Sequence, residues 1–150
     1  DERLRPIEMA LNDTSPEETI VTSNQPVKID LEYTADRKSV MRLVALICQD
    51  GRLWSDEMYG YAKERADEKE RLTLYPFVLI DMTGEHRWFQ AEWGNDDPTA
   101  TIIDFKGRPL AVGHEVERVD TFQGQDERSV YSISSIRPWR GIAGWPNEKN

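Results

Sequence analysis

The stretch from Ala100 to Trp139 constrains the fold more than any other part of the sequence. Short runs rich in β-branched and aromatic residues, such as Thr101–Asp104 and Ser129–Ile133, are separated by turn residues such as Gly107 at close intervals. This spacing is typical of short antiparallel strands joined by tight turns. The stretch therefore predicts a small antiparallel sheet or barrel in the C-terminal part of the chain.

The order of residues within this stretch resembles a known type of barrel. Asp104, Gly107, Leu110, Gly113 and Val116 are spaced as in the opening strands of SH3-like small barrels. In such barrels one glycine makes a turn and a second glycine lets the strand bend sharply. The resemblance implies an SH3-like barrel over residues 99–140 and concerns the fold alone.

Two segments in the first 94 residues have the period-two pattern of a half-buried strand. Val27–Tyr33 places Val27, Ile29, Leu31 and Tyr33 on one face. Arg87–Trp93 does the same with Phe89, Ala91 and Trp93, which leaves Trp88, Gln90 and Glu92 on the other face. Both segments predict strands of an antiparallel sheet.

The segment at about 56–70 predicts the one helix of the chain. Ser55 can cap it, and the acidic residues Asp56 and Glu57 suit the positive end of the helix dipole. Tyr59 and Ala62 lie near one stripe of such a helix.

Together these segments predict a β-rich α+β fold. An antiparallel sheet over 20–94, with a helix near 56–70, packs on a C-terminal SH3-like barrel over 99–140. An irregular arm precedes them at 1–19, and a tail follows at 141–150. A single β-sandwich is the alternative.

Charge and cysteine content narrow the choice of partner and compartment. The 150 residues carry a formal net charge of −9, which argues against binding to duplex nucleic acid or to an anionic membrane, and leaves a basic protein as a partner. No run of apolar residues approaches the length of a membrane span. The single cysteine, Cys48, lies in an apolar run, so we expect it to be buried and inert and the protein to be cytoplasmic.

Few residues suggest catalysis. Asp104, with Asp81, Asp96 or Asp97, could hold Mg²⁺ in a metal-dependent hydrolase. His86 and His114 are the only histidines and have no evident partners, so we expect no metal site and no cofactor. Gln123-Gly124 resembles part of a motif of superfamily 1 helicases, but the phosphate-binding loop that such enzymes need is absent from the sequence, and Gly124 fits a hairpin turn.

The tryptophans suggest a binding surface. Trp88 lies on the predicted outer face with Gln90 and Glu92, and Glu85 precedes it. Large aromatic residues are common at the centres of protein interfaces. The sequence therefore predicts a non-catalytic protein-interaction module that binds a basic partner through these four residues. Two alternatives remain: an acidic inhibitor, such as an immunity protein or nucleic-acid mimic, that covers a basic site on an enzyme, and the hydrolase that uses Asp104.

Overall fold

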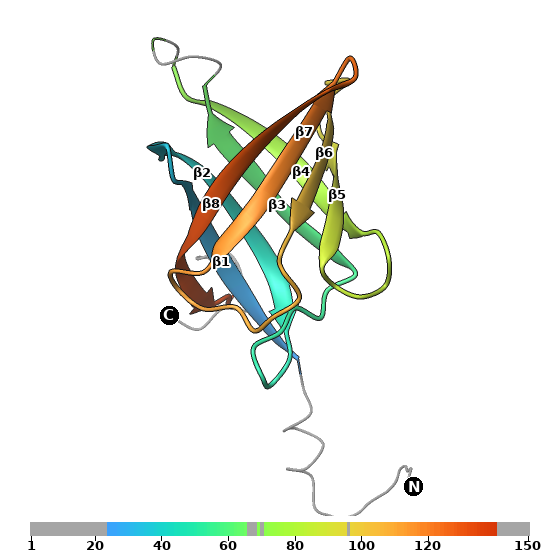
Figure 1. The fold of residues 1–150 in the computed structure, drawn as a ribbon. Coiled ribbons are helices and arrows are strands. Elements are labelled where there is room, and N and C mark those ends of the chain that lie inside the picture. Colours follow the sequence, from blue (N-terminus) through green and yellow to red (C-terminus); the bar gives the residue numbers. More distant parts are fainter. Residues whose placement is uncertain (1–23, 66–68, 70, 96, 141–150) are drawn as a thin grey trace, which may run out of the picture.

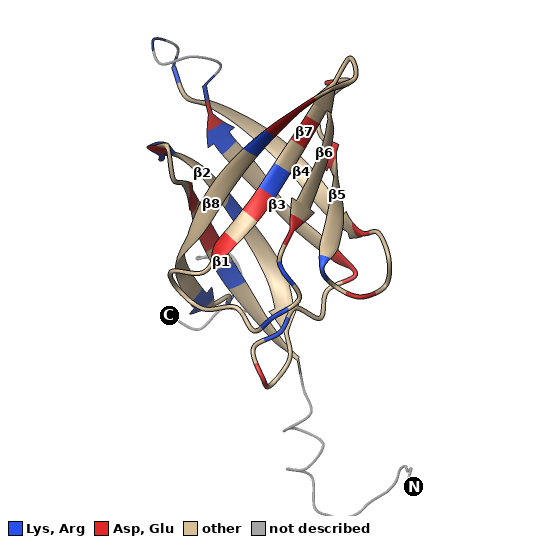
Figure 2. Cartoon of the chain, in the orientation of Figure 1, with Lys and Arg blue, Asp and Glu red and all other residues tan. Residues whose placement is uncertain are grey.

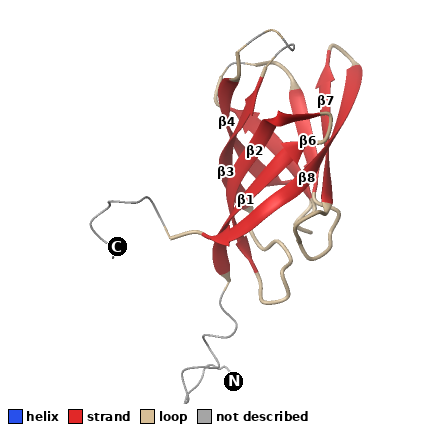
Figure 3. Ribbon diagram, turned by 90° about the vertical axis from the view of Figure 1, so that its left-hand side faces the viewer, coloured by secondary structure: helices blue, strands red, loops and turns tan. Residues whose placement is uncertain are grey.

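The computed structural model describes residues 24–65, 69, 71–95 and 97–140, and these residues form strands and loops without a helix (Figure 3). Within the described residues, no helical segment has the length and apolarity that a membrane crossing requires. The eight strands are β1 (Gln25–Tyr33), β2 (Asp36–Ile47), β3 (Glu57–Glu64), β4 (Thr73–Asp81), β5 (Trp88–Trp93), β6 (Ala100–Asp104), β7 (Glu115–Phe122) and β8 (Gln125–Pro138).

The strands form one closed antiparallel barrel in which each strand pairs with the next along the chain (Figure 1). The last strand closes the barrel against the first, with Val27 opposite Pro138 and Tyr33 opposite Tyr131. The register shifts once in this pair, between Asp30 and Leu31. Closure leaves the sheet without a free edge.

Alternation along the strands fills the barrel interior. In β1 every second residue from Val27 to Leu31 is buried, as the sequence predicted, and Tyr33 on the same face is half-buried. The same pattern holds in β5, where Phe89 and Ala91 are buried and Gln90 and Glu92 are exposed, as predicted. The buried apolar residues form one core inside the barrel.

The two ends of the barrel differ. At one end, which we call the closed end, the chain from Phe105 to His114 bonds to the turn after β2: Leu110 donates its backbone N–H to the Gly51 oxygen at 3.0 Å, and Arg52 donates to the Gly107 oxygen at 2.6 Å. Phe105 is buried beneath these contacts. The other end, which we call the mouth, is bordered by the β1–β2 and β7–β8 turns and by the C-terminal ends of β3 and β5.

The α+β prediction is wrong, because the segment expected to be a helix near 56–70 contains β3 instead. Met58 and Ala62 are buried inside the barrel, whereas Tyr59, expected on the helical stripe, is exposed on the outside. Gly60 lies so close to β2 that a Cβ atom would overlap the carbonyl oxygen of Arg42. A residue without a side chain was therefore needed for strand pairing, and the helical pattern was incidental.

The structure also corrects the expected architecture of the C-terminal part. Residues 99–140 supply β6, β7 and β8, which are three of the eight strands of the barrel, so an SH3-like arrangement is not confirmed. The alternative of a single β-sandwich is replaced by the closed barrel. The arm predicted at 1–19 and the tail at 141–150 lie outside the described residues.

Two local predictions can be compared with the structure. Cys48 is half-buried rather than buried, and its thiol donates to the Asp50 carboxylate at 2.9 Å. The hairpin turn at Gly124 is confirmed: Gln123 and Gly124 both have positive φ, at 52° and 77°, between the paired residues Phe122 and Gln125. This geometry is that of the two-residue turns that join twisted strands.

Candidate functional site

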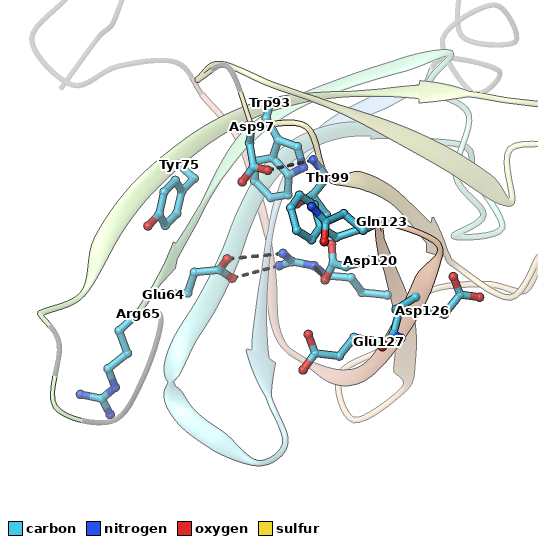
Figure 4. Close-up of a pocket in the computed structure, with 13 residues that line it drawn as sticks. Glu64, Arg65, Tyr75, Trp93, Asp97, Thr99, Asp120, Gln123, Asp126 and Glu127 are labelled. Carbon is cyan, nitrogen blue, oxygen red and sulfur yellow. Dashed lines mark hydrogen bonds and ion pairs between the residues drawn. The ribbon is translucent and has the colours of Figure 1, made fainter.

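The mouth of the barrel opens into a cavity of about 780 Å³. Its walls come from five of the eight strands and from the loop between β5 and β6 (Figure 4). The residues that line it are mainly charged, aromatic or amide: Glu64, Arg65, Tyr75, Trp93, Asp97, Thr99, Arg118, Asp120, Phe122, Gln123, Gln125, Asp126 and Glu127. A cavity of this size lies in the usual range for small-molecule sites.

Arg118 forms the floor of this cavity. Its side chain is only 7% exposed, and its guanidinium donates to the Glu64 carboxylate at 3.0 and 3.4 Å and to Asp120 at 2.9 Å (Figure 4). The third partner of the guanidinium is the Tyr131 hydroxyl, at 3.3 Å. A buried charge is tolerated only when it is paired and hydrogen-bonded, and Arg118 meets both conditions.

Two further hydrogen bonds, through Thr101 and Asp120, fix Trp93 beside Arg118. The Trp93 indole N–H donates to the Thr101 hydroxyl at 3.0 Å, and that hydroxyl donates to Asp120 at 2.5 Å. The Arg118 guanidinium carbon lies 5.2 Å from the centre of the Trp93 ring. The indole is thus held in one orientation, with a cation at its face.

Burial and neighbouring charges set the ionisation of this network. Burial opposes the charge of Arg118, but Tyr131, Glu64 and Asp120 outweigh it and raise the pKa of the guanidinium above its ordinary value. Burial is also the main reason why the pKa of the Tyr131 phenol rises to about 12. At neutral pH the site therefore holds a charged arginine and a neutral tyrosine.

Sequence reasoning missed Arg118, although β7 carries a signal for it. Val116, Arg118 and Asp120 are two residues apart, so a strand that buries Val116 turns the other two the same way. An arginine and an aspartate on the inward face of a strand predict a buried ion pair or a polar cavity. Figure 2 shows acidic and basic residues in close succession along β7.

The four residues predicted to bind a partner lie away from the mouth cavity. Gln90 and Glu92 are exposed on the outer face of β5, and Glu85 is exposed in the loop before it. Trp88 is half-buried, with the Arg87 guanidinium carbon 4.6 Å from the centre of its ring. The structure therefore places three of them on one outer strand face and does not test whether they bind a protein.

Asp104, the residue proposed for a hydrolase, is tied to basic groups. Its side chain is 4% exposed, and its carboxylate accepts hydrogen bonds from the Arg87 Nε at 2.8 Å and from the Lys106 backbone N–H at 2.7 Å. Burial raises the pKa of this carboxyl, but these hydrogen bonds outweigh it, and the net pKa is lowered. Neither Asp81 nor Asp97 is among the described hydrogen-bond or ion-pair partners of Asp104, and these two aspartates bond to different residues. Asp96 lies outside the described residues.

One group of side chains in the described part of the chain has the composition of a metal site. Ligand atoms of Asp56, Asp81 and His86 all lie within 4.8 Å of one another at the closed end. The His86 Nε2 lies 3.1 Å from an Asp56 oxygen and 3.7 Å from an Asp81 oxygen, and Trp54 stacks on the His86 ring. Asp81 already accepts backbone hydrogen bonds from Gly84 and His86, so its carboxylate serves to hold the turn before β5.

Comparisons with known proteins give no relative for the chain: no protein-family model, no curated protein sequence and no solved structure matches it.

Proposed function

We propose that this protein is a non-catalytic binding protein that holds one small molecule in the mouth of its barrel. The observation that carries the proposal is the cavity of about 780 Å³, whose floor is the buried, fully paired Arg118. Eight-stranded barrels enclose an interior that is either filled by side chains or large enough for one small ligand. Here the core fills the closed end, and the mouth remains open.

The lining supports selective binding. Trp93 and Arg118 are held by hydrogen bonds in fixed positions, so a ligand would meet a site that is already formed. Preorganised polar groups cost little ordering on binding and set the orientation of the ligand. Tyr75 and Trp93 meet edge to face, with ring centres 6.5 Å apart, and give the cavity an aromatic side.

The choice of binding over catalysis rests on the residue types present. Among the described residues that line the cavity there is no histidine, cysteine or serine. Glu64 and Asp120, the carboxylates on its floor, are both paired with Arg118. A serine or cysteine nucleophile paired with a histidine base is therefore lacking in the part of the lining that the structure describes.

The earlier expectation of a protein partner stays a prediction. Arg87 covers one face of Trp88 and makes it a weaker anchor than a fully exposed tryptophan, although Gln90 and Glu92 remain accessible. The acidic-inhibitor alternative rests on the net charge of −9, and the hydrolase alternative rests on Asp104; neither gains a specific observation from the structure.

The proposal can be tested with a panel of small polar aromatic molecules of positive, neutral and negative charge, screened by ligand-observed NMR. Gln125 lines the cavity at the start of β8, and Gln125→Trp should fill part of it. Gln25→Trp makes the same change at the start of β1, at the closed end. We expect several molecules of the panel to bind the parent protein, to compete with one another and to bind the Gln125→Trp variant at least about tenfold more weakly, because filling a pocket removes the contacts it offers.

The Gln25→Trp variant should bind like the parent. If no molecule of any charge binds the parent protein, or if both tryptophan variants bind the panel equally well, the mouth cavity is not a ligand site.

A further inference from the structure

The charges that line the mouth cavity are unbalanced. Five carboxylates (Glu64, Asp97, Asp120, Asp126 and Glu127) face two guanidinium groups (Arg65 and Arg118), which gives a formal balance of 2 − 5 = −3. We propose, building on the function proposed above, that the ligand is a small organic cation with an aromatic or apolar body, such as a protonated amine or a quaternary ammonium ion.

Both arginines are already paired with carboxylates. Arg118 is engaged by Glu64 on one side and by Asp120 on the other. Arg65 donates to Asp36 at 3.1 Å, and Figure 4 shows its side chain directed away from the centre of the cavity. An anionic ligand at Arg118 would have to displace one of its two carboxylates, with the cost of leaving that carboxylate without its partner.

Two carboxylates remain available to a cation. Glu127 makes no hydrogen bond or ion pair within the described part of the chain, and it lies opposite Asp120 in the register of β7 and β8, on the inward side. Within the residues that the structure describes, Asp97 is bonded only to Thr99, whose hydrogen bonds lower the pKa of this carboxyl below its ordinary value. Asp126 adds less, because its carboxylate accepts from Thr121 and points away from the cavity in Figure 4.

Aromatic rings complete the recognition chemistry. Tyr75, Trp93 and Phe122 line the same cavity, and Phe122 is 46% exposed. The face of an aromatic ring attracts a cation, and sites for ammonium ligands combine such rings with carboxylates. Trp93 already accepts the Arg118 guanidinium at its face, 5.2 Å from the ring centre.

Three probes of similar size and different charge test this inference by calorimetry at low salt: phenethylamine, 2-phenylethanol and phenylacetate. We expect phenethylamine to bind at least about tenfold more tightly than 2-phenylethanol, and phenylacetate to bind most weakly, because like charges repel across the cavity. The affinity for phenethylamine should fall as NaCl is added, since salt screens partly exposed charges.

Variants locate the charge that matters. Glu127→Gln should weaken phenethylamine binding by about threefold to fivefold, the size expected of one partly exposed ion pair, and leave 2-phenylethanol binding unchanged. Glu115→Gln is the matched control, because it changes the net charge equally at an exposed position at the other end of β7. It should leave both affinities unchanged.

The outcomes separate this inference from the proposed function. Tighter binding of 2-phenylethanol or phenylacetate than of phenethylamine would overturn the assignment of charge while the cavity remained a ligand site. Equal effects of Glu127→Gln and Glu115→Gln would show a general charge effect and would also overturn it. If none of the three probes binds, the cation class is rejected, and the wider panel with Gln125→Trp decides whether the cavity binds ligands at all.

Discussion

The two ends of the barrel use the same strands for opposite purposes. At the closed end, the inward residues of β5 and β7 are Phe89 and Val116, and Phe105 packs beside them. At the mouth, the same two strands turn Trp93 and Arg118 inward, around a cavity. The comparison teaches that β7 changes from apolar packing at Val116 to a buried ionic network at Arg118 within two residues, so the apolar packing and the proposed binding site lie at opposite ends of the barrel.

The largest effect should come from opening the closed end with Phe105→Ala. Phe105 is 2% exposed and meets Phe89 edge to face, with ring centres 5.5 Å apart. Removing a fully buried phenylalanine side chain leaves a cavity, so we expect a loss of about 3–5 kcal/mol in the free energy of unfolding, measured with urea. Phe122→Ala, the same change at a phenylalanine 46% exposed in the mouth, should cost less than about 1 kcal/mol.

If both variants lost a similar amount of free energy of unfolding, the mouth would contribute as much packing as the closed end. The contrast between a packed closed end and an open mouth would then be wrong.

A smaller loss should follow Arg118→Met, which removes the ionic network of the mouth. The variant leaves Glu64 and Asp120 side by side without a cation, and we expect a loss of about 2–3 kcal/mol at pH 7, less than for a fully enclosed pair because the cavity is open to water. Without the arginine, the two negative charges repel each other in the folded variant, and adding a proton relieves this repulsion. The deficit should therefore shrink as the pH falls from 7 toward about 4.

Urea unfolding of the variant and the parent at pH 7, 6 and 5 measures this trend. A deficit that stays constant over this range would mean that Glu64 and Asp120 are not coupled to Arg118 in the folded protein.

Local alternation was predictable from the sequence, and the closure of the barrel was not. The faces of Val27–Tyr33 and of β5 follow from period two alone, and the structure confirms them. The pairing of β1 with β8 joins Val27 to Pro138 across most of the chain, and no local pattern encodes such a contact. The sequence alone also does not explain why a glycine occurs inside a strand at Gly60. The structure explains it, because the Arg42 carbonyl oxygen lies where a Cβ atom would be.

The candidate site was hidden for a related reason. Apart from the period-two pattern of Val116, Arg118 and Asp120 in β7, the carboxylates and arginines of the mouth look like surface charges when their own strands are considered alone. Only the neighbouring strands show that Arg118 is 7% exposed and that Glu64, which is 54 residues away in the sequence, meets it. The sequence has five tryptophans, and it favours Trp88 over Trp93 as a binding residue, because an outer face suggests an interface and an inward face suggests core.

The smallest of these effects should come from Asp104→Asn, which tests whether a buried charge at the closed end acts like the one in the mouth. Asp104 is 4% exposed and accepts hydrogen bonds from Arg87 at 2.8 Å and from the Lys106 backbone at 2.7 Å, which hold its pKa below the ordinary value despite burial. A carboxyl with a lowered folded-state pKa stabilises the fold above its unfolded pKa and loses that contribution as the pH falls through the folded one. Because Arg87 is 41% exposed, we expect a loss of only about 1–2 kcal/mol in the free energy of unfolding at pH 7, and this loss should shrink below pH of about 4.

The control is Asp126→Asn, at an exposed carboxyl, which should cost less than about 0.5 kcal/mol at every pH. Urea unfolding between pH 7 and pH 3 measures both variants, and an Asp104→Asn deficit that persists unchanged at pH 3 would show that shape rather than charge makes Asp104 important.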